Sequence, residues 1–141
     1  MQTCKTIFPN LLLAAVALYG ISCKKESATK TQIQTNQEKI LGKWNLVSEV
    51  VNNYYNGSSH ITTYNFQAGD YMDFKAGGNV TEHKSGSPFT YQYGFINEST
   101  IWLLVPDKKY NLGSLTASDL QMATKEVTGT DYYESTLNLK R

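Results

Sequence analysis

Few residues of this 141-residue chain have the types and spacing that catalysis or metal binding requires. The two histidines, His60 and His83, are far apart in the sequence, and a metal site would need both to converge with a carboxylate. Asp70 and Asp73 stand in one strand-like segment at a spacing that places their side chains on opposite faces. Gly-x-Ser-x-Gly, phosphate-loop and His-Glu-x-x-His patterns are missing. We therefore expect no enzyme, no metal and no cofactor.

Cys23 is the residue with the clearest chemical prospect, because it ends an apolar run and precedes an abruptly polar segment. The N-terminus is basic, residues 11–22 are mostly apolar, and the small residue Ser22 stands directly before the cysteine. This arrangement suits a secretory signal and is short for a membrane span. The other cysteine, Cys4, lies in the same leader, so we expect a folded domain without disulfides. An ordinary cleaved signal in which Cys23 is incidental is the alternative.

The sequence around Cys23 resembles the lipobox of bacterial lipoproteins, although Gly20 stands where that family usually has Leu. The resemblance implies removal of residues 1–22 and attachment of acyl lipid, palmitate included, to Cys23. Several acyl chains together anchor a protein stably in a membrane. Lys24, Lys25 and Glu26 are similar to tags that direct some Gram-negative lipoproteins to the cell surface. The resemblance implies the outer membrane, and it leaves open the inner leaflet or the surface.

Charge and composition divide the rest of the chain into a tether and a domain. Removing residues 1–22 leaves 12 basic and 12 acidic side chains, scattered without a basic stripe, so we expect no nucleic-acid partner. Residues 23–37 are rich in Ser, Thr, Gln and Lys, and we expect them to form a flexible tether. Residues 38–141 are expected to fold as one monomeric domain.

This domain carries the period-two alternation of β-strands almost throughout. Trp44, Leu46 and Val50 alternate with polar neighbours, and turn signals such as Gly77–Gly78 recur every few residues. Eight or nine short strands follow from this pattern, and no helical period is sustained after residue 42. We predict an all-β fold, a small antiparallel up-and-down barrel, with a sandwich as the alternative.

Several motifs resemble those of lipocalins and, more closely, the lipocalin-like domain of bacterial lipoproteins. The first strand opens with Gly42–Lys43–Trp44, a Phe-x-x-x-Gly hairpin runs from Phe74 to Gly78, and Leu115, Thr116 and Leu120 form a late motif. The resemblance implies that Trp44 plugs one end of the barrel and that a late basic residue, here Arg141, stacks on it. Thr130–Asp131 is interpreted as a turn rather than as a family motif.

An inward aromatic face gives the ligand hypothesis. Phe89, Tyr91, Tyr93 and Phe95 alternate along one segment. Apolar side chains with a few hydroxyl groups suit a small-molecule pocket. The candidate ligand-binding residues are Tyr91, Tyr93, Phe95, Phe74, Met72 and Tyr133, with Leu103 and Met122 as further neighbours. A barrel of eight strands is also small enough to be filled by its own side chains. We expect a binder of a small, partly hydrophobic ligand; the alternative is a filled barrel that contacts a protein or glycan, with Tyr54–Tyr55 at an exposed hairpin tip.

Overall fold

The structure is a computed structural model that describes residues 30–141. It contains one helix and nine strands in the order α1 (Gln32–Ile40), β1 (Gly42–Tyr55), β2 (Ser58–Asn65), β3 (Tyr71–Lys75), β4 (Asn79–His83), β5 (Phe89–Asn97), β6 (Thr100–Leu103), β7 (Lys108–Leu115), β8 (Asp119–Thr128) and β9 (Asp131–Lys140). Within this range, no helix combines the length and apolar character that crossing a membrane requires. The predicted signal and Cys23 lie outside the described residues.

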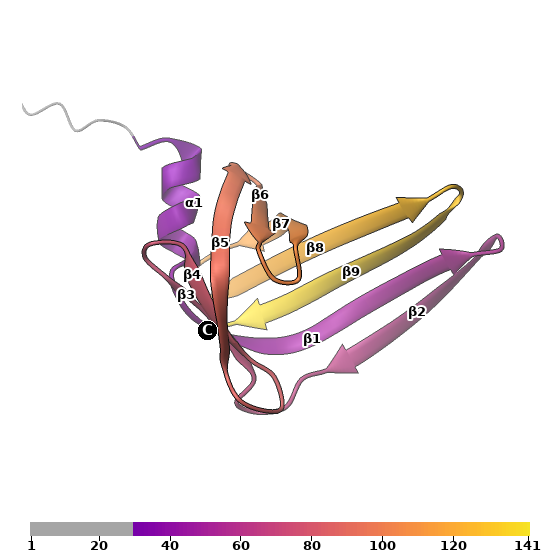
Figure 1. Cartoon of the computed structure of the whole chain (residues 1–141), viewed down its shortest axis with the longest axis horizontal. Helices are drawn as coiled ribbons and strands as arrows, with labels where there is room; N and C mark the ends of the chain where they lie inside the picture. The colour runs from indigo at the N-terminus through magenta and orange to yellow at the C-terminus, as the bar shows by residue number, and fades with distance from the viewer. Residues whose placement is uncertain (1–29) are drawn as a thin grey trace, which may run out of the picture.

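The nine strands form one antiparallel sheet that closes on itself. The strand order is β2-β1-β3-β4-β5-β6-β7-β8-β9, and β9 also pairs with β1 (Figure 1). This second pairing closes β1 and β3 to β9 into an eight-stranded barrel, while β2 pairs with β1 outside the ring. The all-β antiparallel barrel predicted from the alternation is therefore confirmed, with the ninth strand as an addition to it.

Two of the turns show how local sequence sets the pairing. Asn56 and Gly57 have φ values of 51° and 76° and join β1 to β2 through a two-residue loop. Positive φ at both positions is the type I′ geometry, whose twist matches that of the flanking strands. Gly77 and Gly78 also have positive φ between β3 and β4, as their sequence signal predicted. These turns fix the hairpin registers because they leave no freedom for a slip.

Helix α1 corrects the predicted extent of the tether. Residues 32–37, assigned to the flexible tether 23–37, are helical. The helix begins with a capping box, in which Thr31 and Gln34 each satisfy the other's backbone N–H. It ends at Ile40, which is fully buried, and Asn36 Nδ2 donates to the Glu98 carbonyl at 2.7 Å. Composition alone missed this because a capping box and one buried anchor suffice to hold a polar helix against the barrel.

The second halves of β1 and β8, the first half of β9 and the whole of β2 leave the barrel and form a projection that we call the arm (residues 48–65 and 124–136; Figure 1). β3 pairs with β1 only through Gly42–Asn45, and β7 pairs with β8 only as far as Ala123. Beyond these points β2, β1, β9 and β8 continue as a four-stranded antiparallel sheet. A bulge at Val47 marks the departure of β1.

The centre of the barrel is filled with side chains. Eleven core residues from six strands are each at most 5 % exposed: Trp44, Leu46, Met72, Phe74, Val80, Ile101, Leu103, Leu120, Met122, Leu137 and Leu139. A barrel of eight strands is just wide enough for such packing. Of the two possibilities left open by the sequence, the filled interior describes the centre, and the cavities that border the core among residues 30–141 lie toward its two ends.

Candidate functional site

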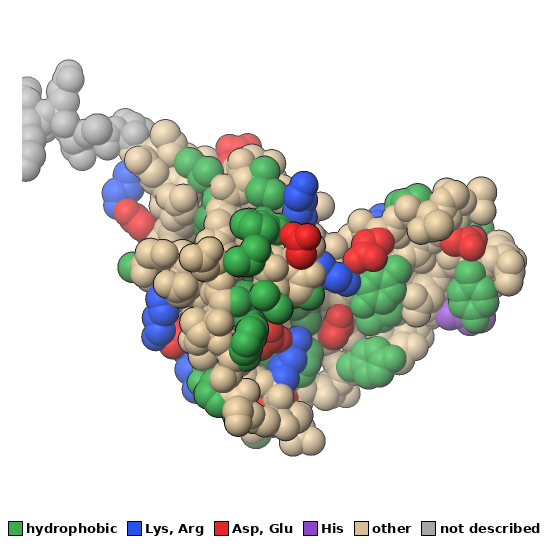
Figure 2. All heavy atoms as spheres, viewed as in Figure 1, with side chains coloured by type: hydrophobic (Ala, Val, Ile, Leu, Met, Phe, Trp, Pro, Cys, Tyr) green, Lys and Arg blue, Asp and Glu red, His purple; other side chains and the backbone are tan. Residues whose placement is uncertain are grey.

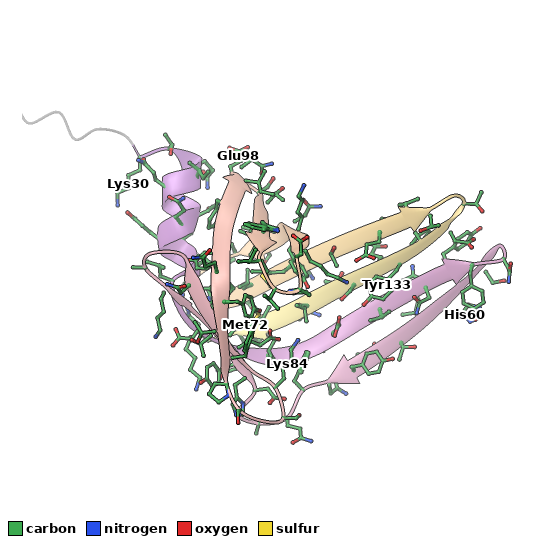
Figure 3. The ribbon with its side chains drawn as sticks, viewed as in Figure 1. Lys30, His60, Met72, Lys84, Glu98 and Tyr133 are labelled. Carbon is green, nitrogen blue, oxygen red and sulfur yellow. The ribbon has the colours of Figure 1, made fainter. Side chains whose placement is uncertain are left out.

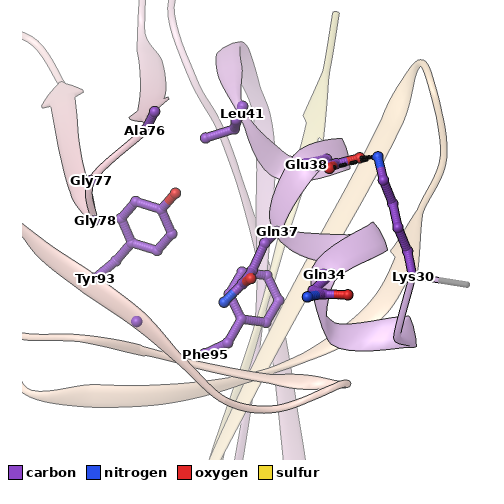
Figure 4. Close-up of a pocket in the computed structure, with 11 residues that line it drawn as sticks. Lys30, Gln34, Gln37, Glu38, Leu41, Ala76, Gly77, Gly78, Tyr93 and Phe95 are labelled. Carbon is purple, nitrogen blue, oxygen red and sulfur yellow. Dashed lines mark hydrogen bonds and ion pairs between the residues drawn. The ribbon is translucent and has the colours of Figure 1, made fainter. Parts of the chain in front are cut away.

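Two concavities lie at opposite ends of the filled centre. One has a volume of about 660 Å³ and lies between α1, the β3–β4 turn and β5 (Figure 4). The other has a volume of about 250 Å³ and lies at the far end, beside the β6–β7 turn. Pockets that hold drug-sized ligands span roughly 300–1,000 Å³. A further hollow of about 510 Å³ lies between the start of α1 and the β5–β6 turn, but no aromatic side chain lines it. Size and aromatic lining together make the first, which we call the α1-end cavity, the better candidate.

Strand β5 supplies the aromatic wall of the α1-end cavity. Tyr93 and Phe95 are half-buried and pack against the hydrophobic core. The Tyr93 ring meets Phe74 edge-on, with centroids 5.0 Å apart, and its hydroxyl donates to the Lys75 carbonyl at 3.2 Å. Burial raises the pKa of Tyr93, so this hydroxyl stays protonated and remains a donor near neutral pH. The wall is thus apolar, rigid and equipped with one fixed hydroxyl.

Helix α1 supplies the polar rim. Gln34 and Gln37 extend from the helix toward the β5 side chains, and Leu41 adds an apolar contact (Figure 4). Lys30 Nζ and Glu38 Oε2 lie 2.7 Å apart at the edge, and both side chains are more than half exposed. Because the two charges compensate each other, the rim presents amide groups without a net charge. The cavity therefore matches an uncharged ligand with an apolar face and some hydrogen-bonding groups.

The smaller concavity is lined by the ends of β4 to β7 and is more polar. The Tyr91 hydroxyl donates to Glu82 Oε2 at 2.7 Å, and Glu82 Oε1 lies 2.6 Å from Lys84 Nζ. Burial, helped by the nearby carboxylates of Glu49 and Glu82, raises the pKa of Tyr110 to about 12. Burial is also the main cause that raises the pKa of Tyr91. The polar groups of Tyr91, Glu82 and Lys84 thus pair with one another, and the volume of this concavity is below the range of drug-sized ligands.

The six ligand-binding residues predicted from the sequence do not form one site. Tyr93 and Phe95 line the α1-end cavity, whereas Tyr91 and Met72 line the smaller one. Phe74 is buried between them. Tyr133 lies on the arm, with Lys108 Nζ 5.2 Å from its ring centroid (Figure 3). Alternation predicted an inward face from Phe89 to Phe95, but Phe89 is 56 % exposed. The pattern also carried no information on where the filled centre divides that face.

The residues that sequence reasoning missed belong to α1. Gln34, Gln37 and Leu41 line the α1-end cavity, and two of them fall in the segment predicted to be a tether. The available signal was Thr31-Gln32-Ile33-Gln34, which fits the capping-box pattern followed by further helix-compatible residues. This pattern predicts that a helix begins at this point, but it does not predict the strand against which the helix packs.

Trp44 and Arg141, named from the lipocalin resemblance as a plug, lie in contact. The Arg141 guanidinium carbon is 4.0 Å from the Trp44 ring centroid. Trp44 Nε1 donates to the Ile40 carbonyl at 2.7 Å, and Arg141 donates to the carbonyls of Lys39 and Leu41. These bonds satisfy carbonyl groups at the C-terminal end of α1 and fix the helix to the barrel.

The two histidines do not come together. His60 lies near the tip of the arm and stacks on Tyr55 at 4.5 Å (Figure 3). His83 stacks on Tyr71 at 5.5 Å, with Nδ1 3.7 Å from Asp70 Oδ1. Among residues 30–141, no three potential metal-ligating side chains form a cluster.

The two aspartates have separate structural surroundings. Asp70 is buried and accepts hydrogen bonds from the backbone N–H groups of Ser85 and Gln67. These bonds lower its pKa, so its carboxylate holds two loops together in ionised form. Asp73 pairs with Lys75 at 2.5 Å on the surface.

Comparison of the chain with protein-family models, with curated proteins and with solved structures finds no match.

Proposed function

We propose that this protein is a lipid-anchored envelope protein whose lipocalin-like barrel binds a small, partly hydrophobic and uncharged molecule non-covalently in the α1-end cavity. The observation that carries the proposal is a cavity of about 660 Å³ with an aromatic wall from β5 and an amide rim from α1. Burial of the ligand's apolar face against Tyr93 and Phe95 would supply affinity. Hydrogen bonds to Gln34 and Gln37 would fix its orientation.

The structure supports a preformed site rather than one assembled on binding. Phe74 holds Tyr93 from within the core, and Arg141 and Asn36 hold α1 in place. A pre-organised cavity loses little conformational entropy when a ligand binds. This favours a carrier or receptor that selects by shape and hydrogen bonding, and no reactive group is required of it.

The experiment is native mass spectrometry of the full chain, purified in mild detergent, followed by denaturation to release bound molecules. We expect a small molecule that is present in wild type and lost in Gln37→Trp, because an indole on this face of α1 occupies the cavity. The matched control is Gln32→Trp, an exposed glutamine on the same helix that does not line the cavity. A wild-type protein without any bound molecule, or equal loss in both variants, would argue against the site.

The proposed location rests on Cys23, which the sequence places after the apolar leader. Lipid attachment there would hold the barrel at the outer membrane. Replacing Cys23 with Ala should move the protein from the membrane fraction to the soluble periplasmic or secreted fraction. Immunoblots of the fractions measure this, and unchanged membrane retention of the variant would contradict the anchor.

A second function is favoured by the filled centre and by the arm. A barrel without interior space can act as a rigid support for a protein- or glycan-binding surface. The residues of β2 are all exposed, so the arm offers such a surface. Binding of a macromolecule by a chain that carries no small molecule would favour this second function.

A further inference from the structure

Strand β2 is the part of the sheet that the closed barrel does not explain. It pairs with β1 on one side, and along its other side no described strand pairs with it. All eight residues of β2 are exposed, so the strand adds little to the core. Free edges are liable to pair with other strands, and natural proteins usually blunt them with charges, Pro or bulges.

The edge of β2 lacks these protective features. Its sequence, Ser-Ser-His-Ile-Thr-Thr-Tyr-Asn, contains no Lys, Arg, Asp, Glu or Pro, and its pairing with β1 runs without a register shift. Residues 124–128 of β8, the opposite edge of the arm, differ. That edge carries Lys125 and Glu126, and Lys108 lies 2.9 Å from Glu126. In Figure 2 the β2 edge likewise shows no acidic or basic colour, whereas charged side chains gather toward β8 and β9.

The hairpin geometry identifies the backbone groups that are free. In a two-residue hairpin the flanking residues, Tyr55 and Ser58, form the first hydrogen-bonded pair, and such pairs alternate along the ladder. Even-numbered residues of β2 therefore direct their N–H and C=O groups toward β1. The odd-numbered residues Ser59, Ile61, Thr63 and Asn65 direct theirs outward, to an edge that is unpaired within residues 30–141.

We propose that β2 pairs with β2 of a second copy of this chain, antiparallel and about a two-fold axis at Thr62. In this register Ile61 and Thr63 of one copy oppose Thr63 and Ile61 of the other, and Ser59 opposes Asn65. Every outward N–H and C=O group then finds a partner. The pairing departs from the monomer expected from the sequence and joins two arms into one eight-stranded sheet.

The side chains of β2 suit this self-pairing. Residues directly opposite in an antiparallel pair share a face of the sheet, so an axis at Thr62 keeps each face continuous. His60 then opposes Tyr64 of the second copy, which brings two aromatic rings together, and no like charges meet. The contact uses the same patch on both copies, so it closes at a dimer. The charged β8 edge opposes further growth into longer sheets.

Cysteine cross-linking tests the register. In the full chain with Cys4→Ser and Cys23→Ser, Thr62→Cys should form a disulfide-linked dimer rapidly under mild oxidation, because the two side chains meet at the axis as a non-hydrogen-bonded pair. The matched control is Thr63→Cys, which is equally exposed but displaced from the axis. We expect its cross-linking to be at least tenfold slower. Equal rates, or no disulfide in Thr62→Cys, would overturn the proposal.

Sedimentation of the full chain tests the interface itself. Wild type at about 0.1 mM should contain dimer, a concentration suited to a weak interface. Thr63→Pro should raise the dissociation constant at least tenfold, because it removes an outward N–H that β1 does not use. Ile61→Lys should do the same by charging the edge, with circular dichroism confirming the fold. A monomeric wild type, or dimers unchanged in both variants, would refute the inference, and neither result bears on the α1-end cavity.

Discussion

The barrel and the arm share three strands, β1, β8 and β9, yet they are stabilised in different ways. In the barrel half of β1, Trp44 and Leu46 are buried and alternate with exposed neighbours, whereas Tyr55 at the arm end of β1 is exposed. β2, which belongs wholly to the arm, buries no residue. A strand can therefore continue beyond the core that its first residues help to form. In the arm half of β1 the backbone stays extended and paired, although fewer of its side chains are buried.

The arm buries only a few side chains, Val51, Thr124 and Ser135, and side-chain pairs across its strands add to them. Tyr54 and Tyr132 stack with centroids 5.1 Å apart, and Lys125 Nζ lies 3.9 Å from the Tyr132 ring centroid. Asn52 donates to the Tyr132 hydroxyl at 3.3 Å and accepts from Ser59 at 2.5 Å. Each such pair contributes roughly 0.2–1 kcal/mol, far less than a buried aromatic residue. The arm is thus suited to contact with a partner, and the barrel to holding shape.

The largest difference between the regions should appear on truncation of large side chains. Trp44→Ala should lower the free energy of unfolding by about 3–5 kcal/mol, because it leaves a cavity in the core and removes the bond to Ile40. Tyr64→Ala, at a residue 55 % exposed on the arm, should change it by less than about 0.5 kcal/mol. Urea denaturation measures both.

If Trp44→Ala does not fold, Trp44→Phe keeps an aromatic ring and should still be less stable than wild type. Similar losses for Trp44→Phe and Tyr64→Ala would remove the distinction between core and arm.

An intermediate effect on the free energy of unfolding is expected at Asp70. The ionised carboxylate of this barrel residue accepts hydrogen bonds from two loops. Its folded-state pKa is lowered from 3.8, first by the Ser85 and then by the Gln67 backbone N–H. A lowered pKa stabilises the fold above the ordinary value, and that stabilisation is lost as the pH falls below about 4 toward the folded-state pKa. Asp70→Asn should therefore be less stable than wild type at neutral pH and should show a smaller loss of stability in acid.

Thermal unfolding between pH 7 and pH 2.5 measures this dependence. The matched control is Asp131→Asn at the first residue of β9 in the arm. It leaves the Asp70 carboxylate and its two backbone hydrogen bonds in place, so it should keep the loss of stability in acid that these bonds cause. An Asp70→Asn profile parallel to that of wild type below pH 4 would contradict the assigned role.

The smallest global effect is expected for the aromatic stack of the arm. Tyr132→Ala should lower the free energy of unfolding by less than about 1 kcal/mol, because it removes one stack and one exposed cation–π contact. Its local effect should be clear: amide exchange in residues 124–136 should accelerate while exchange at barrel amides stays the same. Tyr132→Phe, which keeps the ring, should exchange at nearly the wild-type rate. Equal acceleration in the barrel would show that the arm is part of the core's cooperative unit.

Much of the fold could be predicted from short stretches of the sequence. The alternation around Trp44, the turn signal at Gly77–Gly78 and the hairpin tip at Tyr54–Tyr55 predicted strands and hairpins where the structure has them. The polar composition of residues 30–37 misled, because the stability of α1 comes from a cap and from contacts with distant residues such as Glu98 and Arg141. Contacts between residues so far apart in the sequence cannot be predicted from the residues adjacent to α1.

The candidate site, too, could be predicted from the sequence only in part. Tyr93 and Phe95 could be placed on an inward face from their spacing, but their separation from Tyr91 and Met72 could not. Phe74 and its neighbours fill the space between, and which residues fill a barrel depends on registers set by pairings far apart in sequence.

By itself the sequence determined the class of fold, the faces of the strands and the turns, because a period of two and a positive φ are properties of a few adjacent residues. The tertiary structure decided which strands close the barrel, where the core stops and which residues share a cavity. It also left β2 as an unpaired edge of the described sheet. These features follow from closure between β1 and β9, which are joined through residues nearly the length of the domain apart. A ring of hydrogen bonds can be completed only when both ends of the chain segment are present.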